Sequence, residues 1–221
     1  MLRSLLHNGI SWKCSVLGEQ ALLMEPEVEG SCLDVIHELA QVLEVQKAEG
    51  IVDIVPAYQS LAVLFNARWS HTSLIEWIGN LKVSAASERE SIVHVIPVDY
   101  NAGLDWERVI QQTGLPKSEI IDRHQKPIYT VAMIGFLPGF IFLDGLDALL
   151  STPRLETPRT QIPAGSVGIG GSQTGWYSLE SPGGWNIIGR TNTRIFDPKN
   201  DPPISIKAGD KVRFVPEKGG V

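Results

Sequence analysis

Four arginines lie within residues 154–194, where glycine and proline are frequent and acidic residues are few. They are Arg154, Arg159, Arg190 and Arg194, and the acidic residues of the stretch are Glu156 and Glu180. Guanidinium groups bind carboxylates and phosphates through paired hydrogen bonds, and the amide N–H groups of glycine-rich loops also bind anions. The stretch therefore predicts a site for a small anionic molecule. The alternative is that each arginine is solvated, or forms a structural ion pair with Glu156 or Asp197.

Glycines divide the same stretch into short apolar segments. Glycine weakens the interiors of helices and strands, so this density indicates sharply bent backbone or close approach to another group. Short strands with tight corners are typical of a small β-barrel. We expect the amides from Gly165 to Gly175 to contact an oxyanion or a phosphate group, and Gly183 and Gly184 to belong to the same site.

Polar side chains of the stretch are further candidates for binding. Gln173 and Thr174 lie in the sequence Gly-Ser-Gln-Thr-Gly, where they can bind an amide or carboxylate of a substrate or cap their own turn. Ser166 and Ser181 are included in the substrate-binding or anion-binding set with Arg154, as turn residues rather than as nucleophiles.

His124 precedes Gln-Lys-Pro at the entry to the predicted barrel. Histidine titrates near neutral pH, so it can act as a general base or as a phosphate ligand, and a structural role is the alternative. We predict His124, Arg159 and Arg190 as the catalytic residues, with proton transfer assigned to His124 and anion binding to the two arginines.

Several common site motifs are incomplete in this sequence. Gly165 and Gly170 have the spacing of a phosphate-binding loop, but Gly171 occupies the lysine position. A dinucleotide fingerprint lacks its third glycine at Gln173, and a nucleophile elbow lacks the glycine that Ala164 replaces. The five histidines are scattered and there is no Cys-x-x-Cys, so no metal site is predicted.

Charge and composition exclude some classes of partner. Residues 1–91 carry 6 Lys and Arg against 12 Asp and Glu, whereas residues 92–221 carry 13 of each. An acidic first part argues against a nucleic-acid partner. The sequence has neither a secretion signal nor an apolar run long enough to span a membrane, and its two cysteines, Cys14 and Cys32, have no oxidising context. We therefore expect a cytoplasmic protein with free thiols.

The first part of the chain alternates apolar runs and turns in the order β-α-β-β-α, which is typical of a ferredoxin-like domain. Two strand segments are expected within residues 11–24, and strands at 51–55 and 61–65. One helix is predicted over 31–45 with Ser31 as its N-cap and Asp34 nearby, and a second helix begins at Ser73 with Glu76. A polar linker at 84–91 separates a domain of residues 1–87 from one of residues 92–221.

An apolar run at 92–98 is predicted to be a strand, and its spacing fits either the completion of the first sheet or the start of the second domain. A helix over 104–113 capped by Asp105, a helical turn at 118–123 and a brief helix at 146–150 follow, and short strands dominate from residue 128 on. The expected fold class is α+β, with a ferredoxin-like domain followed by a β-barrel.

Sequence blocks in the second part resemble those of one family. The blocks are GFLPGFIFL at 135–143, TPR at 157–159, IPAGSVGIGGSQTG at 162–175, SPGGWNIIGRT at 181–191 and AGDKVRFVP at 208–216. In content and order they resemble the family of the 5-oxoprolinase B subunit, also called the allophanate hydrolase subunit 1 or sporulation kinase inhibitor family. The resemblance implies that the barrel is cyclophilin-like, and the family pattern has a histidine at the place of His124.

The resemblance also implies a function. A 5-oxoprolinase opens 5-oxo-L-proline to L-glutamate with hydrolysis of ATP, and Mg²⁺ is a possible companion of the nucleotide. This protein would act with a second cyclophilin-like subunit and a lactam hydrolase subunit, and would be inactive alone. The alternatives are inhibition of a sporulation-type histidine kinase through protein–protein binding, and a role related to allophanate hydrolysis.

Overall fold

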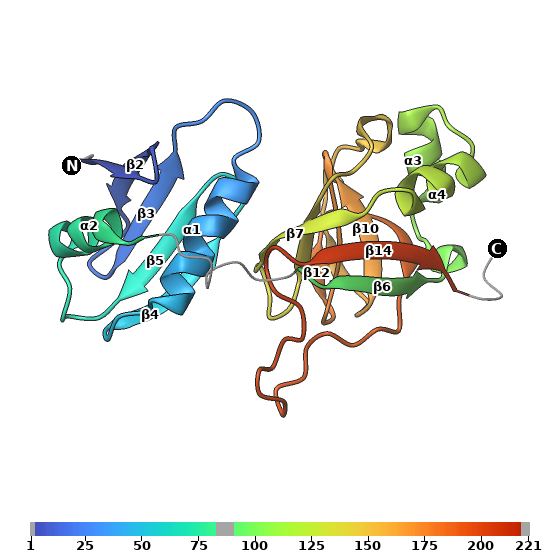
Figure 1. The fold of residues 1–221 in the computed structure, drawn as a ribbon. Helices are drawn as coiled ribbons and strands as arrows, with labels where there is room; N and C mark the ends of the chain where they lie inside the picture. The colour runs from blue at the N-terminus through green and yellow to red at the C-terminus, as the bar shows by residue number, and fades with distance from the viewer. Residues whose placement is uncertain (1–2, 83–90, 218–221) are drawn as a thin grey trace. The chain divides into compact units, whose positions relative to one another are not determined.

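The computed structural model describes residues 3–82 and 91–217, which belong to two compact units divided after Glu90 (Figure 1). The predicted linker at 84–91 lies outside the described residues except for Ser91. Each unit combines a mainly antiparallel sheet with a few helices, so the fold class is the predicted α+β.

The N-terminal unit is a five-stranded antiparallel sheet in the order β1-β2-β3-β5-β4. Its elements are β1 (Arg3–His7), β2 (Ile10–Val16), β3 (Ala21–Pro26), α1 (Leu33–Val45), β4 (Ile51–Pro56), β5 (Leu61–Phe65) and α2 (His71–Asn80). From β3 onward the chain follows the predicted β-α-β-β-α order. Alternate strand residues such as Met24 and Val63 share one core with Ile36 of α1 and Leu74 of α2, so the helices cover one face of the sheet.

Strand β1 was not predicted from the sequence. It pairs with β2 through a two-residue turn at Asn8 and Gly9, whose φ angles are 48° and 76°. Asn-Gly is the preferred pair for such a turn because both positions need positive φ. The dipeptide was therefore a usable signal for the extra hairpin.

The helix starts differ from the predictions by two residues each. Helix α1 begins at Leu33 after Cys32 with no side-chain cap, so the predicted cap at Ser31 is wrong. Helix α2 follows Ser70, whose Oγ accepts a hydrogen bond from the Ser73 amide at 3.1 Å, and Ser73 in turn caps the Ser70 amide. Ser73 thus completes a capping box inside the helix and does not begin it.

The C-terminal unit is built on a seven-stranded sheet in the order β13-β10-β11-β8-β7-β14-β6. These strands are β6 (Val93–Val98), β7 (Tyr129–Ile134), β8 (Ile141–Asp144), β10 (Ser166–Gly170), β11 (Gln173–Trp176), β13 (Asn186–Arg190) and β14 (Lys211–Pro216). Figure 1 shows the last strand, β14, lying between β7 and β6, and β6 is parallel to it. The backbones of Asp99 and Arg190 exchange two hydrogen bonds of 2.8 and 3.0 Å, which join the two edges into a nearly closed barrel.

Short elements complete this unit. They are η2 (Tyr100–Ala102), α3 (Trp106–Thr113), α4 (Lys117–Gln125), η3 (Ala148–Leu150), and a separate pair of strands, β9 (Arg159–Ile162) and β12 (Ser181–Gly183). The barrel interior is apolar, with Val131, Ile169 and Phe214 in its core. A second, smaller core of Phe140, Tyr177, Trp185 and their neighbours is distinct from it.

Candidate functional site

Arg159, a predicted catalytic residue, is bound by Asp105 at the start of α3. The two terminal nitrogens of Arg159 donate to the two carboxylate oxygens of Asp105 at 3.0 and 2.5 Å. Asp105 is almost fully buried and occupies the predicted N-cap position of α3, but its carboxylate accepts the Ile187 amide at 2.6 Å and makes no capping hydrogen bond. The ion pair ties β9, α3 and β13 together, and it satisfies the paired donors that were predicted to hold a ligand.

The other three arginines each have a different partner. The Arg154 guanidinium carbon lies 5.7 Å from the centroid of the Trp185 ring, a cation–π distance. Arg190 donates from Nε to the Ala164 carbonyl at 3.0 Å, and Arg194 lies 3.7 Å from Asp197 with most of its side chain exposed. Arg154 and Arg190 are exposed residues that make no ion pair among the described residues, so they are the arginines best placed to meet an anion.

The amides of the glycine-rich stretch are largely used within the chain. Gly165 donates to the Tyr177 carbonyl at 2.7 Å and Gly171 to the Thr152 carbonyl at 2.8 Å. The Ser166 amide donates to Pro163 at 3.2 Å, and the residues from 167 to 170 belong to the β10 ladder. These amides donate hydrogen bonds to carbonyl groups of the barrel. They are therefore not available to bind a ligand.

Close packing explains why glycine is required at these positions. A Cβ added to Gly175 would lie 2.0 Å from the Ile141 carbonyl oxygen, and one added to Gly183 would lie 2.3 Å from the Tyr177 hydroxyl. A Cβ at Gly170 would lie 2.6 Å from the Trp185 ring, and one at Gly175 would lie 3.5 Å from the same ring. The glycines of β10 and β11 therefore form a flat bed for the Trp185 indole.

Trp185 belongs to a group of rings that we call the aromatic cluster: Phe136, Phe140, Phe142, Tyr177 and Trp185. The Phe140 ring makes edge contacts with Trp185 at 5.3 Å and with Tyr177 at 4.8 Å. Phe136 is 67% exposed and has a φ of 69°, an unusual angle for a phenylalanine. The cluster thus combines a buried base with one ring held at the surface.

Positive charge lies beside this cluster. Burial raises the pKa of Tyr177, while a backbone hydrogen bond and the charges of Arg154 and Arg159 lower it in part, so both arginines act on the same phenol. The Arg154 guanidinium is itself exposed, and such a group suits a ligand that carries a carboxylate.

His124 lies in the barrel core, not at an accessible surface. It is fully buried, and its ring stacks on Phe214 with centroids 4.8 Å apart. Its Nδ1 lies 2.8 Å from the Tyr100 hydroxyl and its Nε2 lies 2.9 Å from Thr174 Oγ1. Burial lowers the pKa of His124 to about 3, so the ring is neutral at ordinary pH. This environment does not suit a base that takes a proton from a substrate.

The remaining predicted residues are divided between the interior and the surface. Thr174 and Ser166 are buried, and Gln173, at the start of β11, is partly exposed. Ser181 donates from Oγ to the Pro182 carbonyl at 3.1 Å, and the Gly184 carbonyl accepts the Leu155 amide at 2.7 Å. Gln173 and Ser181 are thus the polar side chains of this set that are partly exposed.

Comparison with known proteins identifies the family. Residues 12–206 match the family model for the carboxyltransferase domain, subdomain C and D. The chain is 39% identical to the 5-oxoprolinase B subunit of Escherichia coli O157:H7, over 95% of this chain and 98% of that protein. It is 34% identical to the 5-oxoprolinase B subunit of Bacillus subtilis (strain 168), over 93% of each. This chain belongs to the family of the 5-oxoprolinase B subunit.

Solved structures extend the comparison of this family member. TTHA0988 superposes with a TM-score of 0.79 at 33% identity, over 90% of this chain but only 40% of the longer TTHA0988 chain. The Kluyveromyces lactis urea amidolyase superposes with a TM-score of 0.71 at 18% identity, over 94% of this chain and 15% of that chain, a similarity of fold alone. The names of the curated relatives favour neither kinase inhibition nor allophanate hydrolysis.

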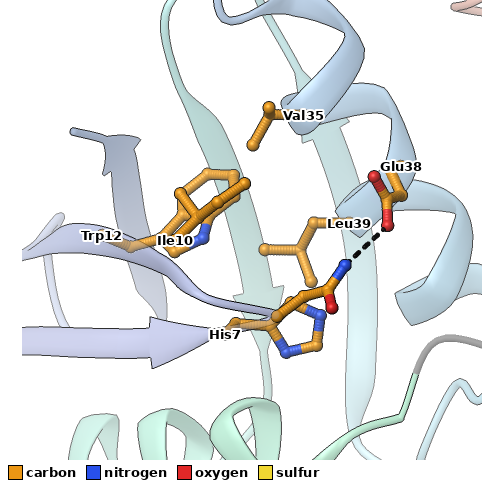
Figure 2. Close-up of a pocket in the computed structure, with 7 residues that line it drawn as sticks. His7, Ile10, Trp12, Val35, Glu38 and Leu39 are labelled. Carbon is orange, nitrogen blue, oxygen red and sulfur yellow. Dashed lines mark hydrogen bonds between the residues drawn. The ribbon is translucent and has the colours of Figure 1, made fainter. Parts of the chain in front are cut away.

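The N-terminal unit of this family member has a small pocket that the sequence did not indicate (Figure 2). Its volume is about 200 Å³ including open solvent, and it is lined by His7, Asn8, Ile10, Trp12, Val35, Glu38 and Leu39. Asn8 donates to Glu38 at 3.1 Å. Among the described residues, both ring nitrogens of His7 and the indole nitrogen of Trp12 have no hydrogen-bond partner of normal geometry. Burial lowers the pKa of His7.

Neither a metal cluster nor a membrane helix is found in the described part of the chain. In residues 3–82 and 91–217, no three His, Cys, Asp or Glu side chains are grouped to hold a metal ion. Within the same ranges no helix is long and apolar enough to cross a membrane.

Proposed function

We propose that this chain is the B subunit of an ATP-dependent 5-oxoprolinase, which converts 5-oxo-L-proline to L-glutamate. One observation carries the proposal: the similarity to a relative of that name covers nearly the whole of both chains, at 39% identity over 95% of this chain and 98% of the relative. A relationship over whole chains supports a shared role better than a shared domain does.

The chemistry of the substrate explains what the complex must do. A lactam carbonyl is a poor electrophile because amide resonance donates electron density to it. Transfer of the γ-phosphoryl group of ATP to the lactam oxygen forms an O–P bond and releases ADP. Water then attacks the activated ring carbon and the C–N bond opens, which leaves a free amine and an acyl phosphate. A second water hydrolyses the acyl phosphate to the carboxylate of L-glutamate and releases phosphate. Such a sequence needs cationic groups on the phosphoryl group and on the substrate carboxylate.

This chain supplies part of such a site. Phe136 provides an exposed ring, and Arg154 provides an exposed guanidinium 5.7 Å from the centroid of the buried Trp185 ring. Arg190 adds a second exposed cation on the strand that closes the barrel. We assign Arg159 and His124 to the support of these groups, because the first is bound to Asp105 and the second is buried.

The rest of the site lies on partner proteins in this proposal. They are a second cyclophilin-like subunit and a lactam hydrolase subunit, which also contribute to the binding of ATP and Mg²⁺. We place the complex in the cytoplasm. Cys14 and Cys32 are buried free thiols, and burial raises the pKa of Cys14 to about 11, so both suit a reducing compartment.

The test is reconstitution of the complex. The chain alone, the partner proteins alone and their mixture are assayed for glutamate formed from 5-oxoproline with ATP. We expect turnover only in the mixture, and a loss of at least about tenfold in kcat/KM on Arg190→Ala but not on Arg194→Ala, a matched exposed arginine. No turnover by the mixture, combined with tight binding to the helical hairpin of a histidine kinase, would refute the proposal.

A further inference from the structure

The hydroxyl group of Thr174 determines which nitrogen of His124 carries a proton. Its single proton is donated to the Gly168 carbonyl oxygen at 3.0 Å, an atom that can only accept. The same Oγ1 lies 2.9 Å from His124 Nε2, so it must accept a hydrogen bond there. His124 Nε2 is therefore the protonated nitrogen.

The opposite nitrogen is fixed by the same reasoning. When Nε2 of a neutral imidazole carries the proton, Nδ1 is an acceptor. The Tyr100 hydroxyl, 2.8 Å away, donates to it. Tyr100, His124 and Thr174 thus each donate one proton in the same direction, and the series ends at the backbone of β10.

The surroundings hold this series in place. All three residues are buried, and the Tyr129 hydroxyl donates to the His124 carbonyl at 2.7 Å. The rings that pack on His124 are Tyr100 from η2, Tyr129 from β7 and Phe214 from β14. Burial is the cause of its lowered pKa. A buried polar group that lost its partner here would destabilise the barrel.

We propose that Tyr100, His124 and Thr174 form a neutral, one-directional hydrogen-bond chain, in which His124 is a positioning residue that holds the β10–β11 hairpin against α4 and β14. The same hairpin contains Gly170 and Gly175, against which the Trp185 indole packs. The chain therefore sets the position of the aromatic cluster from inside the barrel. The effect of this hydrogen-bond chain on turnover rests on the proposed function, whereas the existence of the hydrogen-bond chain does not depend on that function.

The protonation of His124 is measured directly by long-range ¹H–¹⁵N spectra of the full-length chain. The His124 signals are assigned by their loss in His124→Gln. We expect a protonated Nε2, a bare Nδ1 and no titration from about pH 8 to about pH 5. A protonated Nδ1, a doubly protonated ring or a titration midpoint above about pH 5 would overturn the proposal.

The positioning role is tested with two substitutions of one side chain. Thr174→Val keeps the shape but removes the hydroxyl, and Thr174→Ser keeps the hydroxyl. We expect amide hydrogen exchange in β10 and β11 to accelerate at least about tenfold in the Val variant and to change less than about threefold in the Ser variant. Equal acceleration in both variants would refute the role.

A kinetic measurement on the assembled complex completes the test. Thr174→Val should raise KM for 5-oxoproline by about fivefold and lower kcat by less, because it displaces binding groups and removes no reacting group. A larger effect on kcat than on KM would argue against positioning. If the wild-type complex shows no turnover, the proposed function fails, and the spectra and exchange rates still decide on the hydrogen-bond chain.

Discussion

The barrel unit contains two groups of aromatic rings that differ in what reaches solvent. Around His124, the rings of Tyr100, Tyr129 and Phe214 are at most 1% exposed, and both ring nitrogens of His124 are paired. In the aromatic cluster, Phe136 is 67% exposed and Arg154 lies beside Trp185. The residue types that suggest chemistry most strongly serve the interior, while a ring and a cation of the outer cluster remain accessible.

The largest expected effect concerns the glycine bed that separates the two groups. Gly175→Ala places a methyl group 2.0 Å from a backbone oxygen that cannot move freely, so the barrel should lose more than about 3 kcal/mol of stability. Chemical denaturation measures this loss. Gly171→Ala is the control, because nothing lies within 4 Å of its added Cβ and only its φ of 66° is strained. Its expected cost is about 1 kcal/mol, and equal costs would contradict the packing explanation.

Acid should reduce the stability of the barrel through the buried His124. Burial lowers the pKa of His124 from 6.5 to about 3, so between these values the unfolded chain binds a proton that the folded chain excludes. Stability is then full above about pH 6.5 and falls as the pH falls, by about 3 kcal/mol at pH 4. Denaturation at several pH values checks this. The His124→Gln variant should show a smaller acid dependence, and an unchanged one would mean that His124 is not its source.

Loss of the ion pair between Asp105 and Arg159 should reduce stability less than the changes above. Asp105→Asn removes a buried charge that binds Arg159 and the Ile187 amide, and we expect a loss of about 2 kcal/mol after allowance for the partial exposure of Arg159. Thermal unfolding measures it. Arg194→Ala breaks an exposed pair and should cost under about 0.5 kcal/mol. A cost for Arg194→Ala as large as that for Asp105→Asn would mean that burial does not set the strength of these pairs.

The smallest expected effect on stability is in the aromatic cluster. A substitution there should change turnover but not the free energy of unfolding. Phe136→Ala removes a ring that is 67% exposed, so stability should change by less than about 0.5 kcal/mol. Turnover by the assembled complex should nevertheless fall about fivefold if the ring contacts substrate or partner. Unchanged turnover would leave the surface without a role in the reaction.

The sequence predicted the arrangement of elements better than the roles of residues. Periodicity and turn residues predicted strands β2 to β6, helices α1 to α4 and the short η3. The helix η2 was not predicted, and the missed strand β1 had its signal in Asn8 and Gly9. The role of glycine was ambiguous, because a backbone that binds an anion and one that lies under an indole both require the absence of a side chain. Gly170 shows the second case, and only its distance of 2.6 Å to Trp185 reveals this.

The roles of Arg159 and His124 could not be predicted from the sequence for a related reason. The partner of Arg159 is Asp105, which is 54 residues away in the chain, so no local pattern could reveal the pair. The partners of His124 are equally distant: Tyr100 precedes it by 24 residues and Thr174 follows it by 50. Such contacts depend on the closed barrel and not on any segment alone.

The position of β14 has a consequence for synthesis of the chain on the ribosome. This strand, residues Lys211–Pro216, lies between β6 and β7, which are translated far earlier. Until Pro216 has left the exit tunnel, β6 and β7 have no strand between them and their edges can pair with other chains. A nascent or truncated chain that stops before residue 211 should therefore depend on chaperones, whereas the N-terminal unit can complete its own sheet as soon as β5 emerges.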